Sequence, residues 1–292
     1  MSPLSITLLV LFIVLITFVI LIIILCKFWI SITNLKNSIV SPNNKLTTYT
    51  LPQQATLLTI NCYLSFWLAN SPRERLIKLA NTHLINYDIV CMQEAFGVCT
   101  IYTKELIDTM KSHGFQWYCI PQNPSGFKIV DSGLIIFSKI PIIKYEFTPF
   151  NKAGEGADKL AEKGFQSIQL INNTNIINTH IQANISPNSL QIQLNQIKQL
   201  AAHLQQPENT IICGDFNIDY YDKQKYTQFI NTLNIPQTHD ILHSNKEATT
   251  HNNERLDYIL YNPSLCTNTQ IIQMNDISDH NGISTTIQFL FN

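Results

Sequence analysis

The longest apolar stretch of the chain lies near its start, where no charged residue interrupts the run from Ile6 to Cys26. At about 1.5 Å of rise per residue, a helix of this length spans the roughly 30 Å hydrocarbon core of a bilayer. A cleavable signal peptide would have a basic start, a shorter apolar core and small residues before its cleavage site, and these features are absent. We therefore expect a retained, single-pass transmembrane anchor over residues 1–30.

Polar residues follow the apolar run. Lys27, Lys36 and Lys45 come before the first acidic residue, Glu74. Because positive charge flanking a span favours the cytoplasmic side, these lysines predict that the following domain is cytoplasmic. Residues 31–54 are rich in Ser, Asn and Thr and include two prolines, a composition typical of a juxtamembrane linker.

From residue 55 to 292, short apolar runs alternate with amphipathic patterns, without an internal repeat or a second domain boundary. The expected strands are Thr56–Cys62, Ile89–Met92, Gly133–Ser138, Gln166–Ile171, Asn175–Thr179, Thr210–Cys213, Leu256–Leu260 and Ser284–Leu290. The expected helices are Arg73–Asn86, Thr103–His113, Asn188–Leu204 and Lys223–Leu233. Strands in sequential pairs with helices between them predict one α/β domain in which two packed sheets are flanked by helices.

Composition limits the classes of partner. Charged residues make up 13% of the chain, about half the usual fraction, and the net charge is −1. Because proteins that hold nucleic acid usually carry a basic patch, no stable nucleic-acid partner is expected. A nuclease that contacts its substrate briefly remains open.

The seven cysteines are scattered along the chain. They form no Cys-x-x-Cys pair, so neither a zinc site nor a disulfide framework is indicated. Several lie in apolar runs, which predicts buried and reduced thiols.

Polar side chains stand at the ends of several expected strands. Each has an ordinary explanation when taken alone, such as a solvated carboxylate or a turn residue. Together they form an ordered set of acids, amides and histidines that strand ends can bring to one rim of a sheet sandwich. These residues are Asn61, Glu94, His180, Asp215, Asn217, Asp257, Asp279 and His280.

The chemistry of this set is consistent with hydrolysis of a phosphoric ester. Carboxylate and amide oxygens suit Mg²⁺, which usually takes one or two protein carboxylates and keeps several waters. Two histidines can divide acid, base and electrostatic work near neutral pH, and an Asp beside a His can orient its ring. These are the components needed for attack of water on a phosphoryl group.

Three motifs carry a resemblance to a known family: Asp88-Ile-Val-Cys-Met-Gln-Glu94, Gly214-Asp-Phe-Asn217 and Ser278-Asp-His280. In this order they resemble the endonuclease/exonuclease/phosphatase superfamily, which shares the fold of DNase I and neutral sphingomyelinases. The resemblance implies a four-layer α/β sandwich of two mostly antiparallel sheets, with the active site at one end.

The resemblance also implies roles for the first part of the set. Glu94 resembles the main ligand of Mg²⁺, for which Mn²⁺ can substitute, and Asn61 resembles a supporting residue near that metal. His280 resembles the general base that activates water, and Asp257 the carboxylate that orients it. Asp279 resembles the residue that organises the metal side of the site.

The remaining roles concern the phosphoryl group. Asp215 and Asn217 resemble the pair that stabilises the transition state and handles the leaving oxygen, and His180 resembles the histidine that binds a phosphoryl oxygen. Neutral sphingomyelinases also carry an Asp-x-x-x-x-Lys-Gly segment linked to substrate engagement and a switch into the active arrangement. Asp158 and Lys163 match that segment, although a flexible loop with solvated charges is an alternative.

One departure concerns the membrane. Secreted bacterial sphingomyelinases have an aromatic-tipped hairpin before Ser-Asp-His, whereas the segment between Asp257 and Asp279 contains no Trp or Phe. The N-terminal anchor offers another way to hold the site at the bilayer.

The expected function is therefore hydrolysis of a membrane phospholipid, sphingomyelin to ceramide and phosphocholine. An endonuclease or inositol-phosphate phosphatase of the same superfamily is the alternative. A membrane-tethered binding module on an inactive fold is disfavoured, because every core residue is present.

Overall fold

A computed structural model describes residues 3–33, 49–64, 71–96, 102–120, 124–126, 128–151, 154–235, 239–240 and 247–289. The chain divides into two compact units, Met1–Lys36 and Asn37–Asn292. The first unit contains helix α1 (Pro3–Thr33). Its segment Ser5–Ile23 has a mean hydropathy of 3.5 and is long and apolar enough to cross a membrane. A signal sequence meets the same criteria, so the retained anchor stays a prediction.

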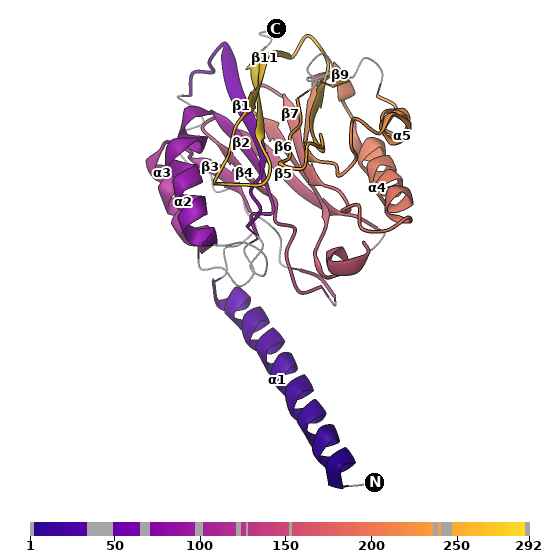
Figure 1. Cartoon of the computed structure of the whole chain (residues 1–292). Coiled ribbons are helices and arrows are strands. Elements are labelled where there is room, and N and C mark those ends of the chain that lie inside the picture. Colours follow the sequence, from indigo (N-terminus) through magenta and orange to yellow (C-terminus); the bar gives the residue numbers. More distant parts are fainter. Residues whose placement is uncertain are drawn as a thin grey trace. The chain divides into compact units, whose positions relative to one another are not determined.

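Two six-stranded sheets form the centre of the second unit (Figure 1). The first sheet has the order β11-β12-β1-β2-β4-β3, with bounds β11 (Cys266–Ile272), β12 (Gly282–Gln288), β1 (Gln54–Asn61), β2 (Ile89–Gln93), β4 (Ile135–Ser138) and β3 (Trp117–Cys119). The second has the order β5-β6-β7-β8-β10-β9, with bounds β5 (Ile142–Pro149), β6 (Gly164–Leu170), β7 (Asn175–His180), β8 (Thr210–Asp215), β10 (Asp257–Tyr261) and β9 (His239–Asp240).

Helices cover the outer face of each sheet (Figure 1). Helices α2 (Pro72–Thr82) and α3 (Tyr102–Ser112) pack on the first sheet, and α4 (Ser189–His203) and α5 (Lys223–Leu233) pack on the second. The shorter 3-10 turns are η2 (Leu84–Asn86), η3 (Gly156–Leu160) and η4 (Pro207–Asn209). This arrangement confirms the expected four-layer α/β sandwich. Only the pairs β1–β2 and β7–β8 are parallel among the strand pairs of the described residues.

The strands are apolar on both faces because both faces are covered. In β1, Leu57 points into the core between the sheets, and its neighbour Leu58 points toward the helices. In β2, Cys91 and Met92 divide in the same way. Since side chains alternate along a strand, a continuous apolar run is what a central strand of this sandwich requires.

All expected strands and helices are present, with small shifts of their ends. The expected helix Arg73–Asn86 ends as an α-helix at Thr82 and continues into the separate turn η2. Four strands were not anticipated: β3, β5, β9 and β11. Each lies at the edge of its sheet, where one side of the strand has no partner and polar residues are tolerated.

Packing of the second unit begins before β1. Tyr49 and Leu51, which the sequence assigned to the linker, lie against the core between the sheets. The Tyr49 ring meets Trp117 edge-on at a centroid distance of 6.0 Å. A soluble domain for experiments should therefore keep residues 49–51.

The cysteines within the described residues are free and buried: Cys62, Cys91, Cys119, Cys213 and Cys266. Burial raises the pKa of the Cys91 and Cys119 thiols, which keeps them protonated. The expectation of buried, reduced thiols is confirmed for these five.

Candidate functional site

The polar strand ends meet at one rim because of the strand pairing. β1 and β2 are parallel, so Asn61 lies beside Gln93 at their carboxyl ends. β7 and β8 are also parallel, which places His180 beside Asp215. β10 runs antiparallel to β8 and places its first residue, Asp257, next to Asp215. The two sheets therefore present amides, acids and histidines at a common edge.

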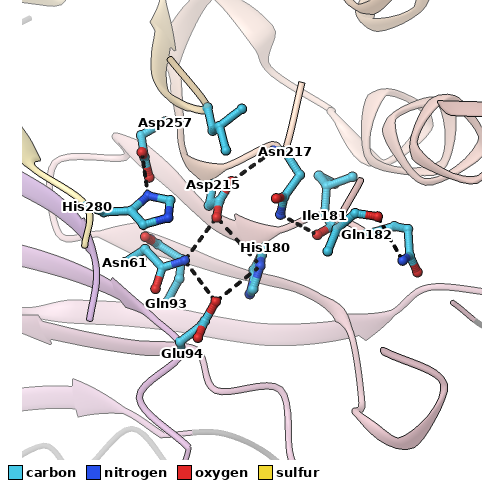
Figure 2. A network of polar contacts seen from close by, with 12 residues as sticks. Asn61, Gln93, Glu94, His180, Ile181, Gln182, Asp215, Asn217, Asp257 and His280 are labelled. Atoms are coloured by element: carbon cyan, nitrogen blue, oxygen red, sulfur yellow. Dashed lines mark hydrogen bonds and ion pairs between the residues drawn. The ribbon is translucent and has the colours of Figure 1, made fainter. Parts of the chain in front are cut away.

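Asn61 joins the two halves of this site. Its side-chain Nδ2 donates to Glu94 Oε1 at 3.1 Å and to Asp215 Oδ2 at 2.9 Å (Figure 2). Its Oδ1 accepts from the backbone N–H of Tyr63 at 3.0 Å. In this arrangement Asn61 orders a carboxylate from each sheet. Because its side-chain oxygen already accepts from Tyr63, Asn61 supports the site by positioning these carboxylates and not as an oxygen ligand.

Glu94 follows β2 in a left-handed backbone conformation with φ of 53°. For a residue other than glycine this conformation is costly, and such outliers gather at functional sites. The side chain is 21% exposed, so its carboxylate faces the rim and not the core. Burial raises the pKa of Glu94, although the Asn61 hydrogen bond and the charge of Lys163 oppose that shift.

His180 ends β7 between two carboxylates. Its Nε2 lies 3.7 Å from Asp215 Oδ2 and 4.0 Å from Glu94 Oε1 (Figure 2). Burial lowers its pKa well below the ordinary value, and the positive charges of Lys163 and His280 lower it further. His180 is therefore a neutral imidazole at physiological pH.

His280 has the opposite electrostatic environment. Its Nδ1 lies 2.8 Å from Asp257 Oδ2 (Figure 2). Burial lowers the pKa of His280, but the charge and hydrogen bond of Asp257, with the charges of Asp215 and Asp279, outweigh it and raise the pKa to about 10. Because Asp257 holds Nδ1, Nε2 is the ring nitrogen left to act on a substrate.

The Gly-Asp-Phe-Asn motif has a local reason for its glycine. A Cβ on Gly214 would lie 2.0 Å from the Thr179 carbonyl oxygen, so only glycine allows β7 and β8 to approach here. The backbone N–H of Asn217 donates to Asp215 Oδ1 at 2.8 Å, and its Nδ2 donates to the Ile181 carbonyl at 3.1 Å. Burial and the charge of Asp257 raise the pKa of Asp215 to about 7, against the opposing effects of His280 and Asn61.

The Ser-Asp-His motif closes the site. Ser278 donates from its hydroxyl to the Asn61 carbonyl at 2.6 Å, which fastens the motif to the end of β1. The Asp279 side chain is partly exposed beside it, with Oδ1 3.5 Å from the Ser278 hydroxyl. The electrostatic effects of Asp279 reach both Glu94 and His280, which places its charge at the site.

Asp158 and Lys163 also come together. Lys163 Nζ lies 3.2 Å from Asp158 Oδ2 and donates to the Ile181 carbonyl at 2.8 Å. Asp158 Oδ2 in turn accepts from the backbone N–H of Ala183 at 2.8 Å. Both residues therefore contact the segment that follows His180. Every predicted site residue lies at this rim or directly beside it.

Two buried amides beneath the rim had no predicted role. Gln93 Nε2 donates to Asn178 Oδ1 at 2.7 Å across the gap between the sheets. Asn178 Nδ2 donates to the carbonyls of Met92 and Ile135 in the opposite sheet. This pair couples β2, which leads to Glu94, to β7, which leads to His180. The signal in the sequence is an amide one or two residues before a site residue in an otherwise apolar strand.

The donor set fits a divalent cation. Among the described residues, Asp215, Asp257 and His280 have ligand atoms within 4.8 Å of one another. Asp257 Oδ1 is buried without a hydrogen-bond partner, and Glu94 adds another carboxylate nearby. Such a concentration of buried negative charge and hard oxygen donors suits Mg²⁺.

Millimolar Mg²⁺ should raise the melting temperature of the folded domain, and more at about pH 8 than at about pH 6. Because the pKa of Asp215 is raised from 3.8 to about 7, the folded protein keeps a proton that the unfolded chain has already lost. The metal-free protein therefore loses stability as pH rises toward 7, whereas the cation binds best once that proton has left. Scanning calorimetry with Mg²⁺ or EDTA measures both effects. An equal gain in Glu94→Gln would contradict Glu94 as a ligand.

Comparison with known proteins points to one family. The family model described as Endonuclease/Exonuclease/phosphatase family matches residues 58–280. A sphingomyelinase of Dictyostelium discoideum is 25% identical over 218 residues, which cover 59% of this chain and 47% of that protein. The chain spans about half the length of the curated relatives it matches.

Solved structures share the fold. The crystal structure of SmcL has a TM-score of 0.65 and 22% identity, covering 82% of this chain and all of that one. The beta toxin of Staphylococcus aureus, in a mutant crystallised with bound magnesium ions, has a TM-score of 0.64 and 20% identity. The match covers 80% of this chain and 99% of the beta toxin chain.

Proposed function

The chain belongs to the endonuclease/exonuclease/phosphatase family, and on this basis we propose that it is a membrane-anchored, Mg²⁺-dependent phosphodiesterase that hydrolyses sphingomyelin to ceramide and phosphocholine. The observation that carries the proposal is the convergence of Glu94, His180, Asp215 and the His280–Asp257 pair at one rim. Relatives named as sphingomyelinases support the choice of substrate.

In the proposed mechanism, His280 is the general base. Asp257 orients its ring through Nδ1, so that Nε2 of the deprotonated imidazole accepts a proton from the water that attacks phosphorus. Because the pKa of His280 is raised to about 10, most of it is protonated at neutral pH without a cation, and the positive charge of a bound cation would favour the deprotonated base. Glu94 would hold Mg²⁺, or Mn²⁺ in its place, with Asn61 ordering the carboxylate and Asp279 adding charge nearby. Bound there, the cation would supply positive charge to the phosphoryl oxygens.

The other side of the site handles the departing group. Neutral His180 can donate a hydrogen bond to a phosphoryl oxygen without adding charge. Without a cation the pKa of Asp215 is about 7, so a large fraction of it carries a proton near neutral pH. Only this protonated fraction can donate to the leaving alkoxide, and a bound cation, which favours loss of the proton, would reduce it. Asn217 holds Asp215 through its backbone N–H. The Asp158–Lys163 pair contacts the segment that follows His180. We propose that it engages the substrate and switches the site into its active arrangement.

We further propose that α1 anchors the protein in the bilayer as a single-pass helix, with the folded domain on the cytoplasmic side. Its length and hydropathy support the span, and Lys27, Lys36 and Lys45 support the orientation. N-terminal sequencing of the mature protein distinguishes an anchor from a cleaved signal sequence. Protease accessibility of the domain in sealed vesicles reports its side.

The substrate is tested by offering sphingomyelin, phosphatidylcholine, phosphoinositides and plasmid DNA in parallel, with Mg²⁺ or EDTA. EDTA-sensitive release of phosphocholine from sphingomyelin alone is the expected result. Nicked DNA or free phosphate with intact sphingomyelin would favour the endonuclease or inositol-phosphate phosphatase alternative and overturn the proposed substrate.

A further inference from the structure

Two exposed aliphatic side chains lie on neighbouring loops next to the site. Among the described residues of the folded domain, the exposed large apolar side chains are Ile143, Leu160, Ile185 and Tyr221. Leu160 is 46% exposed at the end of η3, and Ile185 is 55% exposed in the loop that follows His180. Single apolar residues on a surface are ordinary, so the argument depends on how these two loops are joined.

Residues 154–160 and 181–188, which we name the rim loops, form one surface. Asp158 and Glu155 of the first loop bond to the second through Ala183 N–H and Gln182 Oε1, each at 2.8 Å. The Ile185 side chain lies against Gly156, where an added Cβ would meet Ile185 Cδ1 at 2.6 Å. The two aliphatic side chains therefore belong to loops that are bonded to each other.

The charge on this edge is distinctive. Its carboxylates, Glu155 and Asp158, are half-buried and engaged with the Ser186 hydroxyl and with Lys163. The exposed residues of the rim loops are neutral except Lys159. An apolar and amide surface with one cation is compatible with the zwitterionic headgroup region of a membrane, where an acidic edge would be repelled.

We propose that the rim loops are a bilayer-contact surface, with Leu160 and Ile185 entering the headgroup region and Lys159 lying among lipid phosphates. The inference rests on the proposed function, which requires the site to reach a lipid. Two aliphatic side chains are too few for the core of a stable protein interface, which buries about 800 Å² on each partner. They are sufficient for contact with a membrane to which the proposed anchor α1 tethers the chain.

The rest of the rim supports this assignment. The connection from β11 to β12 at the rim, residues 273–281, has no Trp or Phe, and its Met274 and Ile277 side chains are buried. The rim loops, in contrast, are bonded to the site, since Lys163 and Asn217 both donate to the Ile181 carbonyl next to His180. Lipid that touches Leu160 and Ile185 is therefore close to the reacting centre.

Ile143 provides a matched control. It is 45% exposed, like Leu160, but it lies at the start of β5, where Ile142 pairs with Leu170. The other end of β5 pairs with Gly164, next to Lys163. Ile143 is therefore separated from the rim loops by the length of the strand, roughly 20 Å.

Contact is measured on the full chain reconstituted in phosphatidylcholine vesicles, with and without brominated acyl chains. We expect brominated lipid to quench the added fluorescence of Leu160→Trp and Ile185→Trp, and not that of Ile143→Trp, after subtraction of the parent protein's signal. Equal quenching at all three positions, or none at the rim loops, would overturn the proposal.

Activity gives a second readout. Leu160→Asp and Ile185→Asp should each lower the rate on vesicle sphingomyelin on the order of tenfold, as expected for loss of one inserted aliphatic side chain. Neither should change the rate on a soluble phosphocholine diester, and Ile143→Asp should leave both rates unchanged. Equal losses on the two substrates would refute a role in membrane contact. If the parent protein cleaves neither substrate, the proposed function fails, and the quenching result alone decides the contact surface.

Discussion

Replacing His280 with alanine should lower kcat by about 10³-fold while changing KM little. In the proposed mechanism the imidazole takes a proton from the attacking water, since Asp257 holds Nδ1 at 2.8 Å and Nε2 is the other ring nitrogen. Substrate binding depends on other groups, so the loss should fall on the chemical step. Asp257→Asn should lower kcat less, since the base remains but loses its orientation and its raised pKa.

The measurement is steady-state hydrolysis with Mg²⁺, together with near-UV circular dichroism to confirm the fold. His280→Gln keeps much of the side-chain volume and should lose the same activity. His113→Ala should be as active as the parent. His113 follows α3 and precedes Trp117, which pairs with Ser138 at the end of β4 away from the rim. Glu94→Gln and Asp215→Ala should also abolish turnover. Near-parental rates in His280→Ala would remove His280 as the base.

Replacing Arg255 with methionine should lower the free energy of unfolding by about 3–5 kcal/mol. The Arg255 side chain is fully buried and forms an ion pair with Asp240, whose side chain is 2% exposed. Its guanidinium also lies over the rings of Tyr220 and Tyr258, at 4.2 and 5.5 Å from their centroids. Methionine would leave the Asp240 carboxylate buried with the Tyr226 hydroxyl but without its cation.

Urea unfolding of matched variants tests this prediction. Arg73→Met removes an arginine from an exposed ion pair with Glu105 and should cost less than about 1 kcal/mol. The double variant Arg255→Met/Asp240→Leu should recover much of the loss, because no unpaired charge remains in the core. A cost in Arg255→Met no larger than in Arg73→Met would show that the buried pair contributes little.

Much of the fold was predictable because its central strands are buried on both faces. Apolar runs with polar ends are found in four central strands: β1, β2, β7 and β8. A sequence needs such apolar runs to fill a sandwich of this kind. The edge strand β5 was missed because its residues are largely exposed, so burial imposes little pattern on them. β3 was missed because three residues are too few to show a period.

The sequence by itself predicted which residues gather at the rim, because strand ends and short motifs are local features. Only the tertiary structure decided the contacts and the electrostatic environment of each residue there. His180 and His280 are the same type of residue. Burial and neighbouring cations lower the pKa of His180, whereas Asp257 raises the pKa of His280. The same holds for the amide pair Gln93–Asn178, whose partners come from different sheets. Protonation and cross-sheet contacts depend on charges and burial contributed by segments far apart in the chain, and no local pattern carries that information.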